Sequence, residues 1–297
     1  MKGKIAYILL KITWKLLSLI PLKIMYFLSD LWFYPFYYIL RYRRKIVRKN
    51  LTESFPEKSL DEIIHIEKRF YHFFTDVILE TCKMASFSEK NIKKHIKFMN
   101  VEAIDALLQQ EISVSLFIGH YGNWEWNSSM TLHLTTGIVP GQIYHKLHNP
   151  AVNRLMLWNR SRMGANCVEM KDTLRWINEQ IQNHFVSITG YIADQSPKRH
   201  NQQHFVDFLH HHTPALTGAE KITKKYGFAA FYLDVKRVKR GYYEVDCVQL
   251  HEDPQSLPNF QLTDIYYAHL EKSIQNQPEL YLWTHRRFKY ATTKLSE

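Results

Sequence analysis

The apolar run at residues 114–118 passes directly into a segment that contains two glycines and begins at Gly119. The length of the run and its β-branched and aromatic content are typical of a strand in the core of a sheet. Gly119 and Gly122 loosen the backbone after it, and Asn123 has the side chain of an N-cap for a helix that begins near Trp124. The sequence therefore predicts a buried strand, a tight loop and a helix, with residue 120 at the exposed strand end.

Four more apolar runs have the character of strands, at residues 138–144, 186–192, 229–235 and 242–250. Apolar residues recur at helical spacing over residues 60–84, where Ser59 supplies an N-cap. Further helices at 152–163 and 174–183 separate the second strand from the third. This alternation predicts an α/β fold in which a mixed central sheet is flanked by helices, with functional sites at the strand ends.

His120 is followed five positions later by Glu125. Residues five apart on one continuous helix lie roughly 140° apart, so the two side chains meet more easily if His120 precedes the helix and Glu125 lies in its first turn. A carboxylate that holds one nitrogen of a neutral histidine leaves the other free to take a proton from a hydroxyl or an amine. An incidental surface histidine and a glutamate favoured by the helix dipole explain the same two residues, and both interpretations remain open.

The sequence contains no Gly-x-Ser-x-Gly segment that would present a nucleophilic serine. Direct attack of a bound acceptor on an activated acyl group is therefore the expected chemistry. His210, His211 and His212 lie near His200 and His204, but consecutive histidines in a regular strand or helix cannot all face one ion, and no His-Glu-x-x-His segment accompanies them. These histidines therefore predict a basic loop.

The net charge of +11 is concentrated at the N-terminus. Residues 1–52 hold eleven of the 39 Lys and Arg residues and one of the 28 Asp and Glu residues, and so carry +10 of that charge. Large apolar residues are interleaved with these cations, which favours an anionic membrane surface over a nucleic acid as the partner. The three cysteines lack the spacing of a metal site and are too few for a disulfide framework, which indicates a reducing compartment.

Two helices are expected in this arm, broken near Pro21 and again near Pro35. Lys4, Lys11 and Lys15 share one face of the first helix, whose other faces are apolar, so we expect the lysine heads to reach towards lipid phosphates. Aromatic residues of the second helix suit the headgroup boundary. The longest uncharged run, residues 31–40, is shorter than the roughly 18 to 20 residues of a membrane span.

These features predict a monotopic amphipathic and hydrophobic helical membrane anchor at residues 1–52, followed by a catalytic domain at residues 53–297. The anchor would lie on the cytoplasmic face of a membrane, where lysine and arginine accumulate. Packing of both helices on the globular core is the alternative explanation of their apolar residues.

The segment from Gly119 to Trp126 resembles the His-x-x-x-x-Asp/Glu block of the glycerolipid and lysophospholipid acyltransferase superfamily, in the form found in bacterial lipid A acyltransferases. Further blocks match in the same order along nearly the whole chain: Tyr42-Arg43-Arg44-Lys45 with Asn50-Leu51 and Phe55-Pro56-Glu57, Asn149-Pro150 with Ser161-Arg162-Met163-Gly164-Ala165, Ala193-Asp194-Gln195-Ser196-Pro197, and Leu282-Trp283-Thr284-His285-Arg286-Arg287-Phe288-Lys289.

The resemblance implies that His120 is the general base and that Glu125 supports it. It implies an acyl thioester as co-substrate, usually on acyl carrier protein, a lipid hydroxyl as acceptor, and neither a metal nor another cofactor. The expected substrate-binding residues are Asn123, His145, Lys146, Asn149, Asp194 and Gln195. Arg286, Arg287 and Lys289 have the charge to bind a lipid phosphate or an acidic carrier, and also that of a solvated C-terminal cluster.

Two departures from the family pattern bear on the acceptor. His145 stands where many relatives have an arginine, which leaves a phosphate of the acceptor to Lys146 or Arg154, and a Phe-Phe-Gly segment is replaced at residues 205–209. A lysophospholipid or an aminolipid is therefore an alternative acceptor to a lipid A precursor. A metal-dependent lipid hydrolase and a non-catalytic membrane-binding protein are the alternatives from other functional classes.

Overall fold

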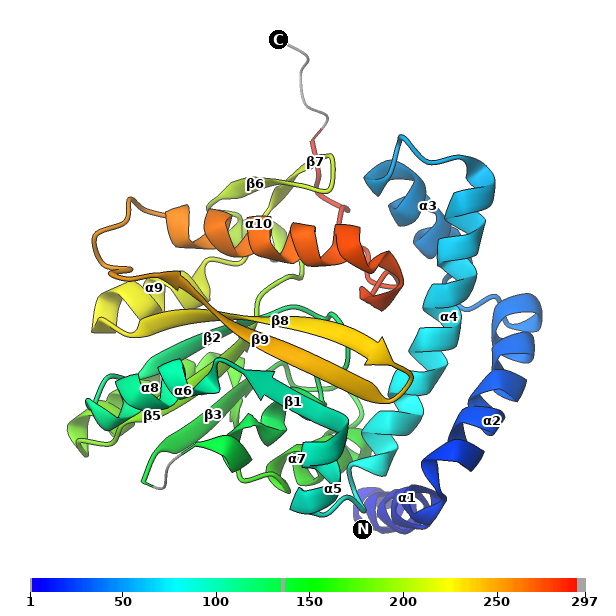
Figure 1. The fold of residues 1–297 in the computed structure, drawn as a ribbon, viewed down its shortest axis with the longest axis horizontal. Helices are drawn as coiled ribbons and strands as arrows, with labels where there is room; N and C mark the ends of the chain where they lie inside the picture. Colours follow the sequence, from blue (N-terminus) through cyan, green and yellow to red (C-terminus); the bar gives the residue numbers. More distant parts are fainter. Residues whose placement is uncertain (1, 135–136, 293–297) are drawn as a thin grey trace.

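The computed structural model describes residues 2–134 and 137–292, and a seven-stranded sheet lies at its centre (Figure 1). The strand order is β1-β9-β8-β2-β5-β3-β4, and the pairs are parallel except for the antiparallel hairpin of β8 and β9. The strands are β1 (Ile96–Met99), β2 (Val114–Ile118), β3 (Val139–Tyr144), β4 (Asn166–Glu169), β5 (Ser187–Ile192), β8 (Ala229–Lys239) and β9 (Tyr242–His251). A separate two-stranded antiparallel sheet joins β6 (Phe205–Phe208) to β7 (His211–Pro214). The predicted α/β fold with a mixed sheet is confirmed.

The helices that follow the N-terminal region are α4 (Leu60–Lys83), α5 (Glu89–His95), α6 (Val101–Gln109), α7 (Pro150–Ser161), α8 (Thr173–Gln182), α9 (Gly218–Tyr226) and α10 (Gln261–Asn276). Helix α4 begins as predicted at Ser59, whose hydroxyl accepts from the Glu62 amide while the Glu62 carboxylate accepts from the Ser59 amide. This reciprocal capping box satisfies two amides that have no partner within the helix.

The helix expected to begin near Trp124 is present, but it begins at Trp126 and is not an α-helix. The chain instead forms a 3₁₀ helix, η2 (Trp126–His133), although the Asn123 side chain does accept a hydrogen bond from the Trp126 amide. Hydroxyls of Ser128, Ser129 and Thr131 each donate to the carbonyl three residues back. Such side chain to backbone bonds compete with α-helical geometry, which accounts for the tighter turn.

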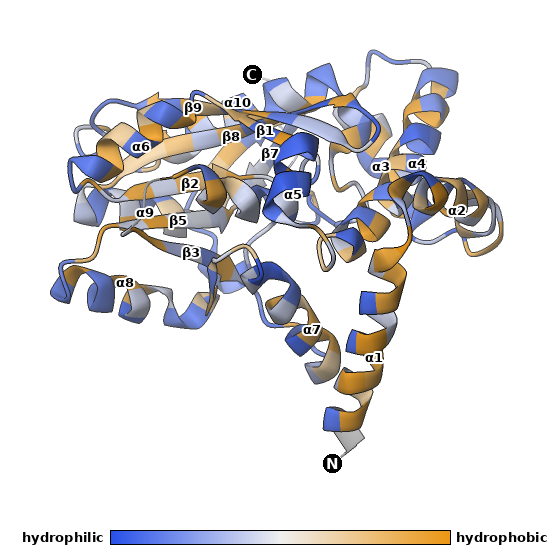
Figure 2. Ribbon diagram, turned by 60° about the horizontal axis from the view of Figure 1, so that its bottom comes forward, coloured by the Kyte–Doolittle hydropathy of each residue, from blue (hydrophilic) through white to orange (hydrophobic). Residues whose placement is uncertain are grey.

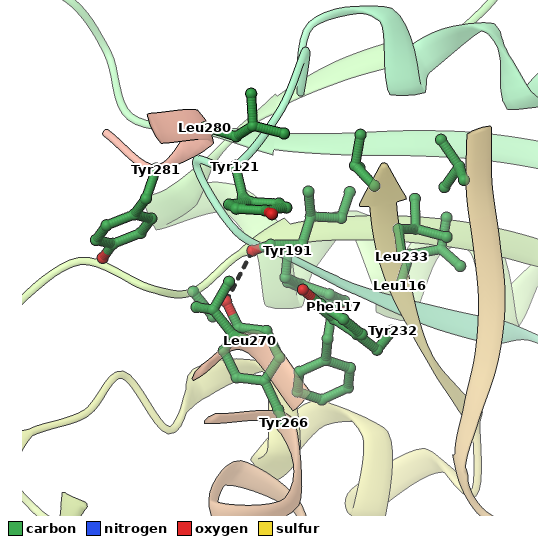
Figure 3. Packing of buried hydrophobic residues seen from close by; sticks show 14 of the residues in the cluster. Leu116, Phe117, Tyr121, Tyr191, Tyr232, Leu233, Tyr266, Leu270, Leu280 and Tyr281 are labelled. Atoms are coloured by element: carbon green, nitrogen blue, oxygen red, sulfur yellow. Dashed lines mark hydrogen bonds between the residues drawn. The ribbon is translucent and has the colours of Figure 1, made fainter. Parts of the chain in front are cut away.

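Near β2 and β8, helix α10 packs on one face of the central sheet and η2 lies on the other. Phe117 of β2 and Tyr232 of β8 point to the side of α10, where they pack against Tyr266 (Figure 3). Because successive side chains of a strand point to opposite faces, Leu116 and Ile118 point away from α10, towards residues of η2. The carboxyl ends of β2 and β5 therefore emerge between a tightly packed face and a face with open space.

Four helical segments precede this body: α1 (Lys2–Leu19), α2 (Leu22–Tyr34), the π-helical turn Pro35–Ile39 and α3 (Arg44–Ser54). The break near Pro21 is confirmed. The α-helix also ends at Tyr34, next to Pro35, and the chain continues from Pro35 as a π-helical turn. Helices α1 and α2 both pack against α4, and α1 also contacts α7. Figure 2 shows α1 as a largely hydrophobic helix that extends away from the sheet.

The orientation of α1 differs from the expectation for its lysines. Lys15 donates to the Ala85 carbonyl at 2.7 Å, and the Lys11 ammonium lies 4.6 Å from the ring centre of Trp158. The lysine face is thus turned partly to the protein, and leucines such as Leu9 and Leu16 are exposed. No single helix of the described residues has the length and apolarity to cross a membrane, whereas α1 and α2 together pass that test with a bend of 111° between them.

Candidate active site

His120 and Asp194 meet at the carboxyl edge of the sheet. Strands β2 and β5 are parallel neighbours in which Ile118 pairs with Ile192, and each of the two polar residues lies two positions beyond its strand. The Nδ1 atom of His120 is 2.7 Å from Oδ1 of Asp194. Parallel strands place their carboxyl ends at one edge, and the register brings these side chains into direct contact.

Asp194 is an ionised carboxylate in a buried position. Burial by itself raises its pKa, but the charge of His120 and hydrogen bonds from the His120 side chain and backbone outweigh that effect, so the pKa is lower than usual. A carboxylate at Nδ1 holds the proton on that nitrogen and leaves the lone pair of a neutral imidazole at Nε2. The arrangement can accept a proton at Nε2 and stabilise the resulting imidazolium.

The remaining surface of the imidazole is bordered by Trp124 and Gln195. The rings of His120 and Trp124 are 5.4 Å apart in a T-shaped arrangement, and the amide nitrogen of Gln195 is 3.4 Å from His120 Nε2. The His120 side chain keeps 19% of its surface exposed. A substrate group can therefore approach Nε2 from outside.

Glu125 does not orient His120 in this structure, which corrects the expected pairing. Its two carboxylate oxygens accept from Arg160 of α7, at 2.8 Å from Nε and 2.5 Å from Nη2. The pair is largely buried, with 6% of the Glu125 side chain and 16% of the Arg160 side chain exposed. Glu125 thus ties the loop after β2 to α7, and its assignment as a catalytic residue stays a prediction.

Asn123 is completely buried and holds the same loop from within. Its Nδ2 donates to Glu80 of α4, which also accepts from the hydroxyls of Tyr26 and Tyr243, each at 2.7 Å. Burial raises the pKa of Glu80. With Nδ2 on Glu80 and Oδ1 on the Trp126 amide, the Asn123 side chain positions the backbone beside His120, and its assignment to substrate binding remains untested.

His145, Lys146 and Asn149 follow β3, at the same edge of the sheet. His145 and Lys146 are exposed, and Nδ1 of His145 lies 3.0 Å from the Lys146 carbonyl. Asn149 caps α7, where its side chain accepts from the amides of Ala151 and Val152. The two exposed side chains have room for a substrate group, whereas the amide oxygen of Asn149 is engaged in the cap.

The C-terminal block contributes His285 and Arg287 to the surroundings of Asp194. Burial lowers the pKa of His285 to about 4, in spite of the opposing charge of Asp194. Arg287 is 1% exposed, and donates to the Thr213 hydroxyl at 2.7 Å and to the Tyr267 hydroxyl at 3.1 Å. Arg287 is therefore not part of a solvated cluster, while Arg286 and Lys289 are exposed.

A small, largely apolar cavity that is open on one side lies close to the histidine. Its wall includes Ile118 and Ile192, each two positions before His120 or Asp194, and Trp124, which touches the imidazole. Gly190 lies between Leu116 and Gln142 in the strand register and leaves the floor without a side chain there. Most of the lining is apolar, which suits a hydrocarbon group.

The histidines of the β6–β7 hairpin make separate contacts. His211 stacks on Phe288 with ring centres 3.7 Å apart, and His212 lies 3.0 Å from Asp207. Within residues 2–134 and 137–292, no group of three or more His, Cys, Asp or Glu side chains is arranged to hold a metal ion.

Sequence reasoning named Asp194 but missed its contact with His120, and it missed Arg160 and Glu80. The available signal for the first was that His120 and Asp194 occupy equivalent positions after two buried strands. Arg160 and Glu80 lie within helical patterns, and nothing in their spacing indicates which loop they contact.

The family of bacterial lipid A biosynthesis acyltransferases matches residues 3–290 of this chain. The lipid A biosynthesis palmitoleoyltransferase of Escherichia coli (strain K12) is 25% identical over 262 residues, which cover 84% of this chain and 80% of that protein. A lipid A biosynthesis acyltransferase of Shigella flexneri has the same identity and coverage. The lipid A biosynthesis lauroyltransferase of Escherichia coli (strain K12) is 23% identical over 257 residues, with the same shares covered. The chain is an acyltransferase that belongs to the family of bacterial lipid A biosynthesis acyltransferases.

Proposed function

We propose that this protein transfers a fatty acyl chain from an acyl thioester to a hydroxyl group of a membrane lipid in lipid A biosynthesis. The observation that carries the proposal is a histidine whose Nδ1 is held by a buried carboxylate and whose ring contacts Trp124, a residue in the wall of an apolar cavity. The names of the similar bacterial enzymes support lipid A as the product.

In the proposed reaction, the acceptor hydroxyl first binds at Nε2 of His120. This nitrogen removes the hydroxyl proton as the hydroxyl oxygen attacks the thioester carbonyl. Asp194 stabilises the imidazolium that forms. When the tetrahedral intermediate collapses, the carbon–sulfur bond breaks and the imidazolium returns the proton to the departing thiolate. The products are the lipid ester and a free thiol, so the reaction needs no oxidant, metal or organic cofactor.

Replacement of His120 tests this mechanism. His120→Ala should lower turnover by about 10³-fold or more, since it removes the base, while the variant still binds acyl donor and membranes. His133→Ala is the matched control, because His133 lies at the far end of η2 and its ring packs against Phe98. Purified His120→Ala that transfers acyl chains at the wild-type rate would overturn the mechanism.

The donor is proposed to arrive on acyl carrier protein, whose acidic surface suits the exposed cations Arg286 and Lys289. The acceptor is proposed to be a lipid A precursor, and His145 and Lys146 are the exposed side chains proposed to meet its polar head. Lipid mass spectrometry of a strain that lacks the protein identifies the acceptor. Loss of one acyl chain from a phospholipid or aminolipid, with lipid A intact, would contradict this acceptor.

The proposed location is the cytoplasmic face of the inner membrane, with α1 and α2 as the anchor. Support comes from the exposed apolar side chains of both helices, including Leu9, Leu16, Phe27 and Trp32. The exposed cations of residues 41–49 also favour anionic lipid, whereas Arg44 and Arg48 are paired with Glu67. A nucleic acid is not among the proposed partners.

A further inference from the structure

The apolar cavity beside His120 contains two side-chain amides whose polar atoms are buried without partners. Asn127 of η2 is 5% exposed and lines the cavity, as does Gln142 of β3. In the described part of the chain, neither Nδ2 nor Oδ1 of Asn127 has a hydrogen-bond partner, and the same is true of Oε1 of Gln142. The other polar groups of the same wall are different: Ser128 donates to the Glu125 carbonyl and Thr131 to the Met163 carbonyl.

These orphaned atoms are unexpected in a pocket that serves only a plain hydrocarbon. A buried polar group without a partner carries an unfavourable desolvation cost, and a saturated chain would leave that cost in place. Rotation of the Asn127 amide by 180° would exchange its nitrogen and oxygen, and both positions lack partners.

The chemistry of the two amides selects the ligand group. Asn127 provides both a donor and an acceptor, and Gln142 adds an acceptor. A carbonyl on the ligand would satisfy donors alone and leave the acceptors unpaired. A hydroxyl group donates one hydrogen bond and accepts others, so it can satisfy both kinds of atom.

We propose that the cavity binds a fatty acyl chain that carries a hydroxyl group, and that Asn127 and Gln142 recognise this hydroxyl. The inference rests on the proposed function in one respect, since it takes the chain to be that of the acyl donor. A pocket that hydrogen-bonds a substrate hydroxyl discriminates against the analogue without it, because its own polar groups are then left unpaired.

The first experiment measures binding, which is independent of transfer. Calorimetric titration compares dodecanoic acid with the positional series of monohydroxydodecanoic acids on the full-length protein in detergent. We expect at least one hydroxylated isomer to bind about tenfold or more tightly than dodecanoic acid. Wild-type protein that binds dodecanoic acid at least as tightly as every hydroxylated isomer, or that binds none of them saturably, overturns the inference.

Variants assign the discrimination to the two amides. Asn127→Leu and Gln142→Met, which remove the polar atoms at similar volume, should each reduce the preference for the hydroxylated chain several-fold, and either suffices if the other fails to fold. Thr131→Val is the matched control, because it removes a hydroxyl from the same wall that already has a partner, and should leave the preference unchanged. Discrimination that persists in the folded amide variants overturns the inference.

A transfer assay separates this inference from the proposed function. Dodecanoyl thioester and the preferred hydroxydodecanoyl thioester compete as donors, and the product ratio is compared between wild-type protein and Asn127→Leu. A wild-type preference for the hydroxylated donor that the variant loses supports the inference. Transfer with the same ratio in both proteins overturns it for the donor and leaves the proposed function intact. Hydroxyl-dependent binding without transfer of any chain overturns the proposed function and supports the assignment of the cavity.

Discussion

At the scale of single residues, the carboxylate that contacts His120 comes from a neighbouring strand and not from the segment that contains His120. The carboxylate of Glu125, five positions after His120, accepts hydrogen bonds from Arg160. Asp194 follows the neighbouring strand, and its Oδ1 lies 2.7 Å from Nδ1 of His120. The position of Asp194 in the interior is important, since a buried carboxylate is little screened by water. Its interaction with an imidazolium is correspondingly stronger than that of a surface pair.

Asp194→Asn is expected to lower turnover by about 10²- to 10⁴-fold with little change in KM for the donor. An amide in place of the carboxylate neither stabilises the imidazolium nor fixes the proton on Nδ1. The comparison variant in steady-state kinetics is Glu125→Gln, which keeps the shape of the side chain that binds Arg160 but removes its charge. A larger loss of turnover in Glu125→Gln than in Asp194→Asn would return the orienting role to Glu125.

The Glu125–Arg160 pair gives a separate prediction about stability. Arg160→Met leaves the Glu125 carboxylate buried without a cation, which should cost about 3–5 kcal/mol of the free energy of unfolding. The double variant Glu125→Gln/Arg160→Met removes both charges and should recover part of that loss. Urea unfolding monitored by tryptophan fluorescence measures both values. Additive losses in the double variant would show that the two side chains do not interact.

His285 is expected to make the free energy of unfolding fall as the pH is lowered, because its pKa is lower in the folded protein than in the unfolded chain. The ring titrates near its ordinary pKa of 6.5 in the unfolded chain and near 4 in the folded protein, where burial disfavours its charge. Between these values the unfolded chain binds more protons, so the stabilising contribution is complete above pH 6.5 and falls as the pH drops towards 4. It amounts to at most about 3 kcal/mol, reduced by the partial exposure of the ring.

His285→Gln should flatten this pH dependence. Unfolding free energies of both proteins at several values between pH 4.5 and 7 give the slope directly. An unchanged slope in the variant would mean that His285 is solvated in the folded protein.

At the scale of elements, the sequence pattern predicts the strands that are buried on both faces of the sheet. All five residues of β2 are buried, and its predicted bounds agree with the structure. Strands β1 and β4, with four residues each at the edges of the sheet, were missed because so short an edge strand carries little apolar pattern. Strand β7 was missed as well because its four residues are polar and include two histidines, and β6 (Phe-Val-Asp-Phe) was missed because it is only four residues long.

The candidate site shows the same division. Its histidine could be predicted from a strand that ends in a polar loop, but its partner could not, because contact between His120 and Asp194 depends on which strands are neighbours and in what register. Glu80 was missed for a related reason. A carboxylate on the buried side of α4 contradicts the apolar pattern, and its donors come from three distant segments.

The turn between β8 and β9 contains Gly241, whose lack of a side chain leaves room for Tyr26 of α2. Gly241 has a φ of +75°, and a Cβ atom on it would lie 2.1 Å from the hydroxyl oxygen of Tyr26, which reaches past the turn to Glu80. Gly241→Ala should therefore destabilise the fold by more than about 1 kcal/mol, through backbone strain and displacement of Tyr26.

Gly218→Ala is the control for this substitution. Gly218 begins α9 and has nothing within 4 Å of an added Cβ atom, so alanine there should be neutral or slightly stabilising. Thermal unfolding of the two variants checks the contrast. Equal unfolding temperatures would contradict a docking role for the turn.

At the scale of the whole molecule, the helices proposed as the membrane anchor lie against elements that lead to the candidate site. Helix α1 packs against α7, and α7 begins six residues after the end of β3, at the edge of the sheet where His120 lies. The lysines Lys11 and Lys15 contact the protein and leave the leucines of α1 outward. This arrangement favours an acceptor lipid that reaches His120 from the bilayer without first entering water.

The last prediction tests whether this apolar surface binds lipid. Leu9 and Leu16 are 61% and 62% exposed on α1, and the pair Leu174 and Ile181 has the same spacing of seven residues on α8 at 52% and 40% exposure. Leu9→Glu/Leu16→Glu should weaken binding to vesicles of phosphatidylethanolamine and phosphatidylglycerol by roughly 10- to 100-fold, because two apolar side chains no longer enter the acyl boundary. Leu174→Glu/Ile181→Glu adds the same charge and should change binding by less than about 3-fold. Sedimentation of the protein with vesicles measures both, and equal losses in the two double variants would assign membrane binding to overall charge instead of to α1.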